Sequence, residues 1–104
     1  MNILKSNIDL NGKHYVNFLF EDSDFNLIDS KEIKQAIQDE IDKGIINISI
    51  DFTNIKSLNS SGLGILIGCL KLVKQANGSL KLMNLNEKIL NIFKITKLNL
   101  IFEI

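Results

Sequence analysis

The first clear pattern along the chain runs from His14 to Phe20, where Val16, Phe18 and Phe20 fall on one face and the residues between them fall on the other. This repeat of two residues is typical of a β-strand. Asn11-Gly12, directly before this segment, is a strong signal for a tight turn between two strands. We therefore expect residues 3–9 to pair with residues 14–20 as a β-hairpin.

A second alternating segment runs from Ile45 to Phe52. Its even positions carry Ile46, Ile48, Ile50 and Phe52, and its odd positions include Asn47, Ser49 and Asp51. A strand that is buried on both faces would be apolar throughout. We therefore expect a sheet with one covered face and one wetter face, with Asn47 and Ser49 on the wetter face.

Helices are indicated where apolar residues recur every three or four positions between capping and terminating residues. The predicted helices run from the capping residues 29–32 to Gly44, from Ser61 to about Ala76, and from Glu87 to Ile95. A short strand at 80–83 and a final strand or tail at 99–104 complete the order.

Strands that alternate with helices favour parallel crossover connections. No linker, repeat or low-complexity segment divides the 104 residues. The expected fold class is therefore α/β, a single domain over residues 1–104. Its sheet is mixed and has four to five strands, with helices mainly on one face.

Composition excludes several kinds of function. The net charge is zero and there is no arginine, which argues against direct binding of nucleic acid. A single cysteine and a single histidine cannot build a disulfide framework or a zinc site, and we expect no metal and no cofactor. We interpret His14 as an ordinary strand or surface residue and Cys69 as a core thiol.

Membrane insertion is not expected, because no segment approaches the ~20 consecutive apolar residues of a spanning helix. The N-terminus lacks the basic and apolar regions of a signal peptide. An unpaired cysteine is consistent with a reducing compartment, so we expect a cytoplasmic protein.

The segment with candidate chemistry is a polar loop that ends in Asn59, Ser60 and Ser61 at the start of a predicted helix. Asparagine and serine are preferred N-caps, but one cap accounts for only one of them. Gly62 and Gly64 follow, although each glycine costs a helix roughly 1 kcal/mol relative to alanine. Small residues here leave the hydroxyl groups open to a partner, and a helix N-terminus tolerates a phosphate on Ser60 or Ser61.

The helix that follows has an apolar arc of roughly 220°, wider than the usual stripe of a surface helix. Leu63, Ile67 and Leu70 form the shoulder of this arc. Either the C-terminal helix covers the shoulder, or Leu63 and Ile67 belong to a partner surface. We favour coverage for Leu70 and a partner surface for Leu63 and Ile67.

The run from Ile50 to Gly68 resembles the signature of STAS domains, the anti-sigma factor antagonist family. In that signature a strand ends in Asp, a short loop follows, and D-S-S-G or D-S-T-G opens an apolar helix. The resemblance extends through the flanking elements to nearly the whole chain.

The resemblance implies a non-enzymatic binding module in a partner switch. An antagonist of this type binds an anti-sigma factor that is also a serine kinase of the histidine-kinase-like ATPase type, and thereby frees a sigma factor. The kinase then phosphorylates the serine before the glycine, which is Ser61 here, with Ser60 as second choice. The motif's leading Asp is Asn59, and a second loop Asp of the family falls on Asn26, with Asp24 nearby. The expected partner-binding residues are Asn59, Ser60, Gly62, Leu63, Gly64, Ile67, Asn26 and Asp24.

A second function uses the same docking surface without phosphorylation. STAS-like domains also serve as constitutive subunits of phospholipid-transport ATPase complexes and of signalling scaffolds. A free-standing single domain with an intact Ser-Ser-Gly motif favours the switch over the constitutive subunit.

Overall fold

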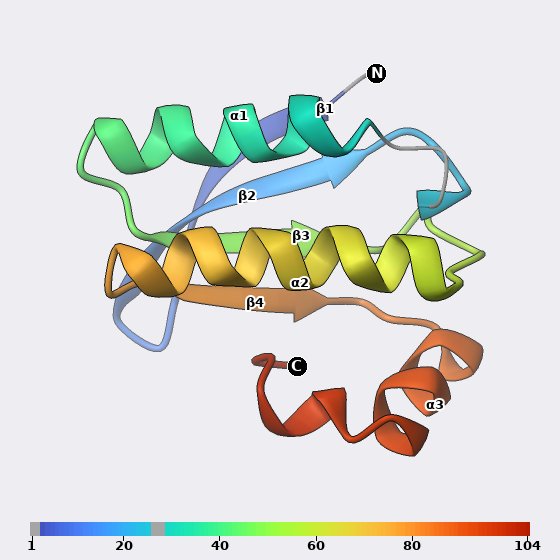
Figure 1. Ribbon diagram of the computed structural model, residues 1–104. Coiled ribbons are helices and arrows are strands. Elements are labelled where there is room, and N and C mark those ends of the chain that lie inside the picture. The colour runs from blue at the N-terminus through green and yellow to red at the C-terminus, as the bar shows by residue number, and fades with distance from the viewer. Residues whose placement is uncertain (1–2, 26–28) are drawn as a thin grey trace.

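The structure is a computed structural model that describes residues 3–25 and 29–104 (Figure 1). In chain order the elements are β1 (Ile3–Leu10), β2 (Lys13–Phe20), α1 (Ser30–Asp42), β3 (Asn47–Asp51), α2 (Ser60–Gln75), β4 (Ser79–Met83), α3 (Glu87–Ile95) and the 3-10 helix η2 (Leu98–Leu100). The predicted order of elements is confirmed. The expected final strand or tail is a tail: after η2 it joins the sheet through a single bridge between Lys81 and Glu103.

The sheet has four strands in the order β1-β2-β3-β4. The β1–β2 pair is antiparallel, and β2–β3 and β3–β4 are parallel, so the sheet is mixed as predicted. Asn11 and Gly12 connect the hairpin with φ angles of 52° and 81°. Two adjacent residues with positive φ match the twist of the flanking strands, which explains the Asn-Gly sequence.

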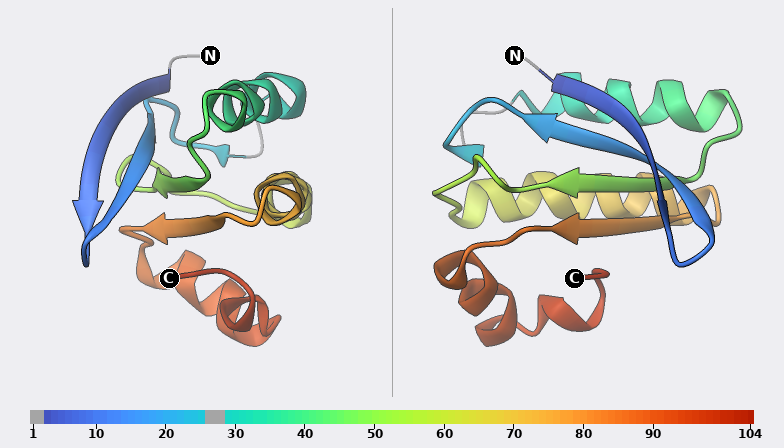
Figure 2. Two further views of the ribbon diagram at one scale, coloured as in Figure 1. Left: turned by 90° about the vertical axis from the view of Figure 1, so that its left-hand side faces the viewer. Right: turned by 180° about the vertical axis from the view of Figure 1, so that it is seen from behind.

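Helices α1 and α2 lie side by side on one face of the sheet, and α3 lies beyond the β4 edge (Figure 2). The helix-facing side chains of β2, β3 and β4 form one buried cluster with the inner faces of the helices. Its largest fully buried members include Phe18, Phe20, Phe52, Phe93, Ile33, Ile37, Ile48, Ile50 and Leu66. Placement of the helices mainly on one face is therefore confirmed.

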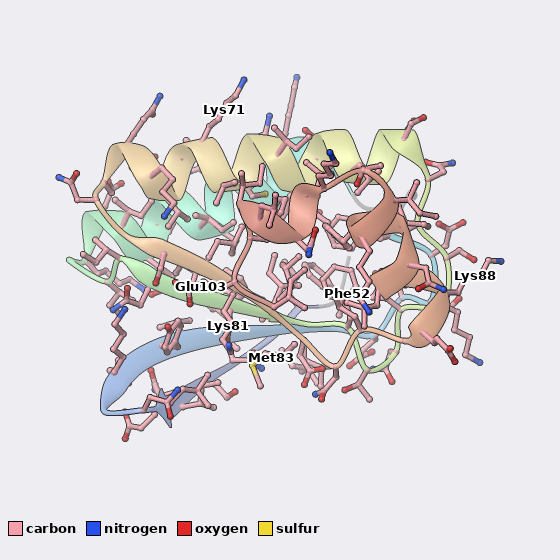
Figure 3. All side chains as sticks on the ribbon, turned by 90° about the horizontal axis from the view of Figure 1, so that it is seen from below. Phe52, Lys71, Lys81, Met83, Lys88 and Glu103 are labelled. Atoms are coloured by element: carbon pink, nitrogen blue, oxygen red, sulfur yellow. The ribbon has the colours of Figure 1, made fainter. Side chains whose placement is uncertain are left out.

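The opposite face of the sheet corrects the expectation of a wetter surface. Ser49 is fully buried and Asn47 is half-buried, although no helix covers this face in the described residues. Ser49 Oγ donates a hydrogen bond to Asn17 Oδ1 at 2.6 Å, and its neighbour on β4 is the longer Lys81 (Figure 3). A short side chain paired in this way is enclosed by its neighbours, so its polar character does not place it in water.

The loops after β2 and β3 and the N-terminus of α2 all lie at the same end of the sheet (Figure 1). This follows from the parallel order of β2, β3 and β4, which brings their carboxyl ends to one edge. The candidate site lies at this end of the molecule.

Candidate functional site

The loop that leads into α2 is held by the loop that follows β2. The Lys56 backbone N–H donates to the Ser23 carbonyl oxygen at 2.7 Å, and Asp24 and Ser57 form an isolated parallel bridge. Asp24 therefore lies next to the segment that leads into α2. Asn26, the other loop residue expected there, lies outside the described residues.

Asn59 caps α2, which begins at Ser60, one residue earlier than predicted. Asn59 Oδ1 accepts the backbone N–H of Ser61 at 2.9 Å and that of Gly62 at 3.4 Å. Its carbonyl oxygen accepts the N–H of Leu63 at 2.9 Å. An asparagine thus gives the capping contacts that an aspartate would give, without the charge. The cap fixes Ser60 and Ser61 in the first turn, and both are exposed.

The glycines near this turn differ in their surroundings. Gly62 is buried, so it adds no exposed surface to the site. Gly64 is exposed, and a Cβ atom added there would meet nothing within 4 Å in the described part of the chain. Packing within these residues therefore does not require a glycine at position 64.

Leu63 and Ile67 are half-buried and pack against the core, while part of each side chain stays exposed beside Gly64. Leu70, the third residue of the predicted shoulder, is only 8% exposed. Leu70 is therefore buried within the chain and adds little to any exposed surface. Residues three or four apart on a helix are neighbours, so one surface carries hydroxyl groups, a glycine and two partly exposed apolar side chains. We call this surface the α2 docking face, which consists of Asn59, Ser60, Ser61, Leu63, Gly64 and Ile67.

A shallow pocket of about 260 Å³ borders the α2 docking face beside Asn59. The loop before α2 forms one wall, with Lys56. Helix α3 forms the other wall, with Lys88, which is labelled in Figure 3. The remaining lining residues are Ser57, Leu58, Ile89 and Ile92. The sequence pattern gives no sign of this pocket, because residues 87–95 predict a helix but not the loop against which it packs.

Asp51 connects the loops after β3 and β4. Its Oδ1 accepts the Thr53 backbone N–H at 2.9 Å, the Thr53 hydroxyl, and the Asn84 side-chain N–H at 3.0 Å. Partial burial raises the pKa of Asp51, but the bonds from Thr53 and Asn84 together outweigh burial and hold this pKa below its ordinary value. The carboxylate is therefore a structural acceptor at the base of the loop that leads to Asn59.

The two other residues with potential chemistry have ordinary roles, as predicted. Cys69 is buried, and burial raises the pKa of its thiol to about 12 against the opposing charge of Lys34. The thiol therefore stays protonated and unreactive. His14 lies exposed on the hairpin, within 3.2 Å of Asp9 Oδ1 and of Asn7 Oδ1.

Within residues 3–25 and 29–104, no three side chains of the histidine, cysteine or acidic type come together in a way that could hold a metal ion. No helix in this part of the chain has the length and apolar character needed to cross a membrane. The chemistry available at the α2 docking face is that of exposed hydroxyl groups at the positive end of a helix, flanked by apolar surface.

Comparison with known proteins agrees with this geometry. The family model for the STAS domain matches residues 7–104. The anti-sigma-B factor antagonist of Bacillus subtilis is 40% identical over 58 residues, which are 56% of this chain and 53% of that relative. The matched stretch thus spans about half of the Bacillus protein. The anti-sigma-B factor antagonist of Listeria monocytogenes is 29% identical over 87 residues, covering 83% of this chain and 75% of the relative.

Among solved structures, the Bacillus cell fate determinant SpoIIAA in its phosphorylated form superimposes with a TM-score of 0.65. The match covers 97% of this chain and 88% of SpoIIAA at 17% sequence identity, and it shows that the two proteins share a fold. Sequence and structure therefore lead to one assignment: the chain belongs to the STAS domain family.

Proposed function

We propose that this protein is an anti-sigma factor antagonist that works by partner switching. In its unphosphorylated form it binds an anti-sigma factor that is also a serine kinase, so that a sigma factor is released. The antagonist names of the Bacillus and Listeria relatives support this role. The observation that carries the proposal is Ser61, an exposed hydroxyl in the capped first turn of α2 beside the open position Gly64.

Ser61 is the proposed phosphoacceptor, and Ser60 is the second choice. In the transfer, Ser61 Oγ forms a bond to the γ-phosphorus of ATP, the bond to ADP breaks, and a base of the kinase takes the hydroxyl proton. The product carries about −1.5 to −2 charges at neutral pH. The N-terminus of α2 stabilises such a charge by about 0.3–1 kcal/mol, so the fold is retained.

Release of the partner follows from desolvation. A partner seated on the α2 docking face removes water from Ser61, and a phosphate there would lose its hydration without a matched counter-charge. That loss is larger than the help from the helix dipole, so the phosphorylated protein dissociates. SpoIIAA, which shares the fold, is known in a phosphorylated form, which supports this part of the proposal.

The partner is proposed to contact the α2 docking face together with Asp24 on the adjoining loop. Asn59 supplies the cap and no charge. Asp24 forms a bridge with Ser57 in the loop before α2, which supports Asp24 as the source of a carboxylate for this contact. Lys56 and Lys88 border the neighbouring pocket. Gly62 is buried, so we do not propose that it touches the partner directly.

We further propose that the chain is a substrate and binding module rather than an enzyme, and that it acts in the cytoplasm. The phosphoryl donor and the catalytic groups belong to the kinase. Cytoplasmic ATP supports that chemistry, and the buried thiol of Cys69 is compatible with a reducing compartment.

The test is incubation with the cognate kinase and ATP, followed by mapping of phosphate by mass spectrometry. We expect phosphate on Ser61 in the wild type and in Ser60→Ala, and none in Ser61→Ala. Ser61→Ala should still bind the kinase, because the hydroxyl is exposed and the cap from Asn59 uses the backbone N–H, which alanine keeps. Phosphate confined to Ser60 would move the acceptor by one residue.

A kinase complex that forms without any phosphate on the chain would contradict the switch. The same surface would then serve a constitutive STAS-type subunit of a phospholipid-transport ATPase complex or signalling scaffold. Absence of kinase binding altogether would contradict the antagonist role itself.

A further inference from the structure

Strand β1 presents a long unpaired edge. It forms one border of the sheet, and no other strand of the described residues pairs with its outer side. It has eight residues without glycine or proline, and most of them are exposed, including Leu4 at 51%. Proteins usually shorten, break or cover such an edge, because its free N–H and C=O groups can pair with another chain.

The charges of β1 are arranged symmetrically about Asn7. Lys5 and Asp9 are its two charged residues, and they lie two positions before and two positions after Asn7. Their partners in β2 are Phe18 and His14, which are four residues apart and therefore lie on the same face of the sheet. Phe18 belongs to the buried cluster under the helices, so Lys5 and Asp9 lie on the face that carries the helices. A central lysine normally discourages edge pairing, but a second charge of opposite sign at the symmetric position changes this.

Antiparallel pairing of two copies centred on Asn7 places Lys5 of each copy opposite Asp9 of the other. The same register places Leu4 opposite Leu10 on the other face, and this pair also occurs twice. A shift by two residues in either direction moves Asp9 opposite Ile3 or Asn7 and removes both ion pairs. Charge pattern and apolar pattern therefore select one register.

We propose that the β1 edge is a homodimer interface, in which two copies of this chain pair their β1 strands antiparallel about a two-fold axis through Asn7. The two sheets then continue into one another. Strand β1 lies at the border of the sheet opposite β4, and α2 lies over β3 and β4 (Figures 1 and 2). The α2 docking face therefore stays accessible in the dimer. This inference does not depend on the partner switch, and either can fail alone.

Sedimentation equilibrium of the full chain over a range of concentrations tests the proposal. We expect a reversible monomer–dimer equilibrium in the wild type. Lys5→Glu and Asp9→Lys, each alone, should raise the dimer Kd about tenfold, because each replaces two opposite-charge pairs by two like-charge pairs. The double variant Lys5→Glu/Asp9→Lys should return the Kd to near the wild-type value.

The double variant separates the interface from effects within the chain. Lys5 Nζ lies 3.2 Å from Glu40 Oε1, and this ion pair is lost in Lys5→Glu. In the double variant the carboxylate introduced at position 5 still faces Glu40, so any recovery of the dimer comes from contacts between copies. Lys71→Glu, an exposed substitution on α2, is the matched control and should leave the Kd unchanged (Figure 3).

Circular dichroism of every variant verifies the fold before sedimentation. A monomer at all concentrations would overturn the proposal. A dimer that is unaffected by both single substitutions, or that the double substitution fails to restore, would also overturn it, because its interface would then lie elsewhere or have another register.

Discussion

The two halves of α2 use glycine in different ways. In the second half, a Cβ atom at Gly68 would come within 2.7 Å of Lys34 Cε on α1. Just past the end of the helix, a Cβ atom at Gly78 would overlap the Ile46 carbonyl oxygen. In the first half, a Cβ atom at Gly64 would meet no described neighbour within 4 Å.

The contrast between Gly78 and Gly64 shows two different reasons for a glycine, one from packing within the fold and one from outside it. Gly78 gives the space through which the chain passes from α2 to β4, so the fold itself requires it. Gly64 lowers the stability of the helix without a corresponding contact in the described residues. A destabilising residue that the fold does not require is typical of a surface where something else binds.

The largest expected effect is on stability, at Gly78. Gly78→Ala places a methyl group against the Ile46 backbone, which cannot move as a flexible side chain can. We expect the free energy of unfolding to fall by about 3 kcal/mol, as for severe overpacking. Urea denaturation followed by circular dichroism measures it. Gly68→Ala is the matched control and should cost less, because the Lys34 side chain can shift. Equal losses at both positions would contradict the distinction.

Most of the fold was predictable because its signals are local. The period of two in residues 14–20 and the Asn11-Gly12 turn predict the hairpin, and the structure confirms both. The burial of Ser49 was not predictable, because it depends on a hydrogen bond from Ser49 on β3 to Asn17 on the neighbouring strand β2. A polar residue on a strand indicates solvent exposure only when no side chain on the neighbouring strand can form a hydrogen bond with it. Which side chain lies beside it depends on the register of the two strands.

The site was predictable in part for the same reason. Asn59, Ser60, Ser61 and Gly64 lie close together in the sequence, so their position at a helix start can be recognised from it. The pocket between Lys56 and Lys88 joins segments that are distant in the sequence, and periodicity carries no information about how α3 is placed.

The second prediction concerns partner binding in the first half of α2. Ser61→Asp adds a charge that an anti-sigma partner must desolvate, and we expect its affinity to fall by about 30-fold, or about 2 kcal/mol. Isothermal titration calorimetry with the anti-sigma factor measures this change. Gln75→Glu adds the same charge to the exposed last turn and should leave the affinity unchanged. Equal losses in both variants would show that net charge, not position, controls binding.

The third prediction tests the loop between β3 and α2, which leads into the first half of α2. The bonds from Thr53 and Asn84 hold the folded pKa of Asp51 below its ordinary value. Ionised Asp51 therefore contributes stability that is fully present above the unfolded pKa, near pH 4, and is lost as pH falls through the lower folded pKa. Asp51→Asn should cost about 1 kcal/mol at neutral pH, a modest figure because the side chain is partly exposed.

Thermal unfolding from pH 7 to about pH 2.5 measures this dependence. The difference between the wild type and Asp51→Asn should shrink as the pH falls below about 4, because protonation removes the charge in the wild type as well. A difference that stays constant over the whole range would show that the ionised form of Asp51 contributes nothing.

The smallest expected effect is at Gly64, and it has the opposite sign to the effect at Gly78. Gly64→Ala should raise the free energy of unfolding by about 0.5–1 kcal/mol, because alanine is the better helix former and the added methyl group meets no described neighbour. The same methyl group stands on the α2 docking face, so the affinity for the anti-sigma factor should fall in the variant that folds better. Urea denaturation and calorimetry on one preparation measure both changes. A gain in stability with unchanged affinity would show that Gly64 lies outside the interface, and a loss of stability would show that the fold does need a glycine at this position.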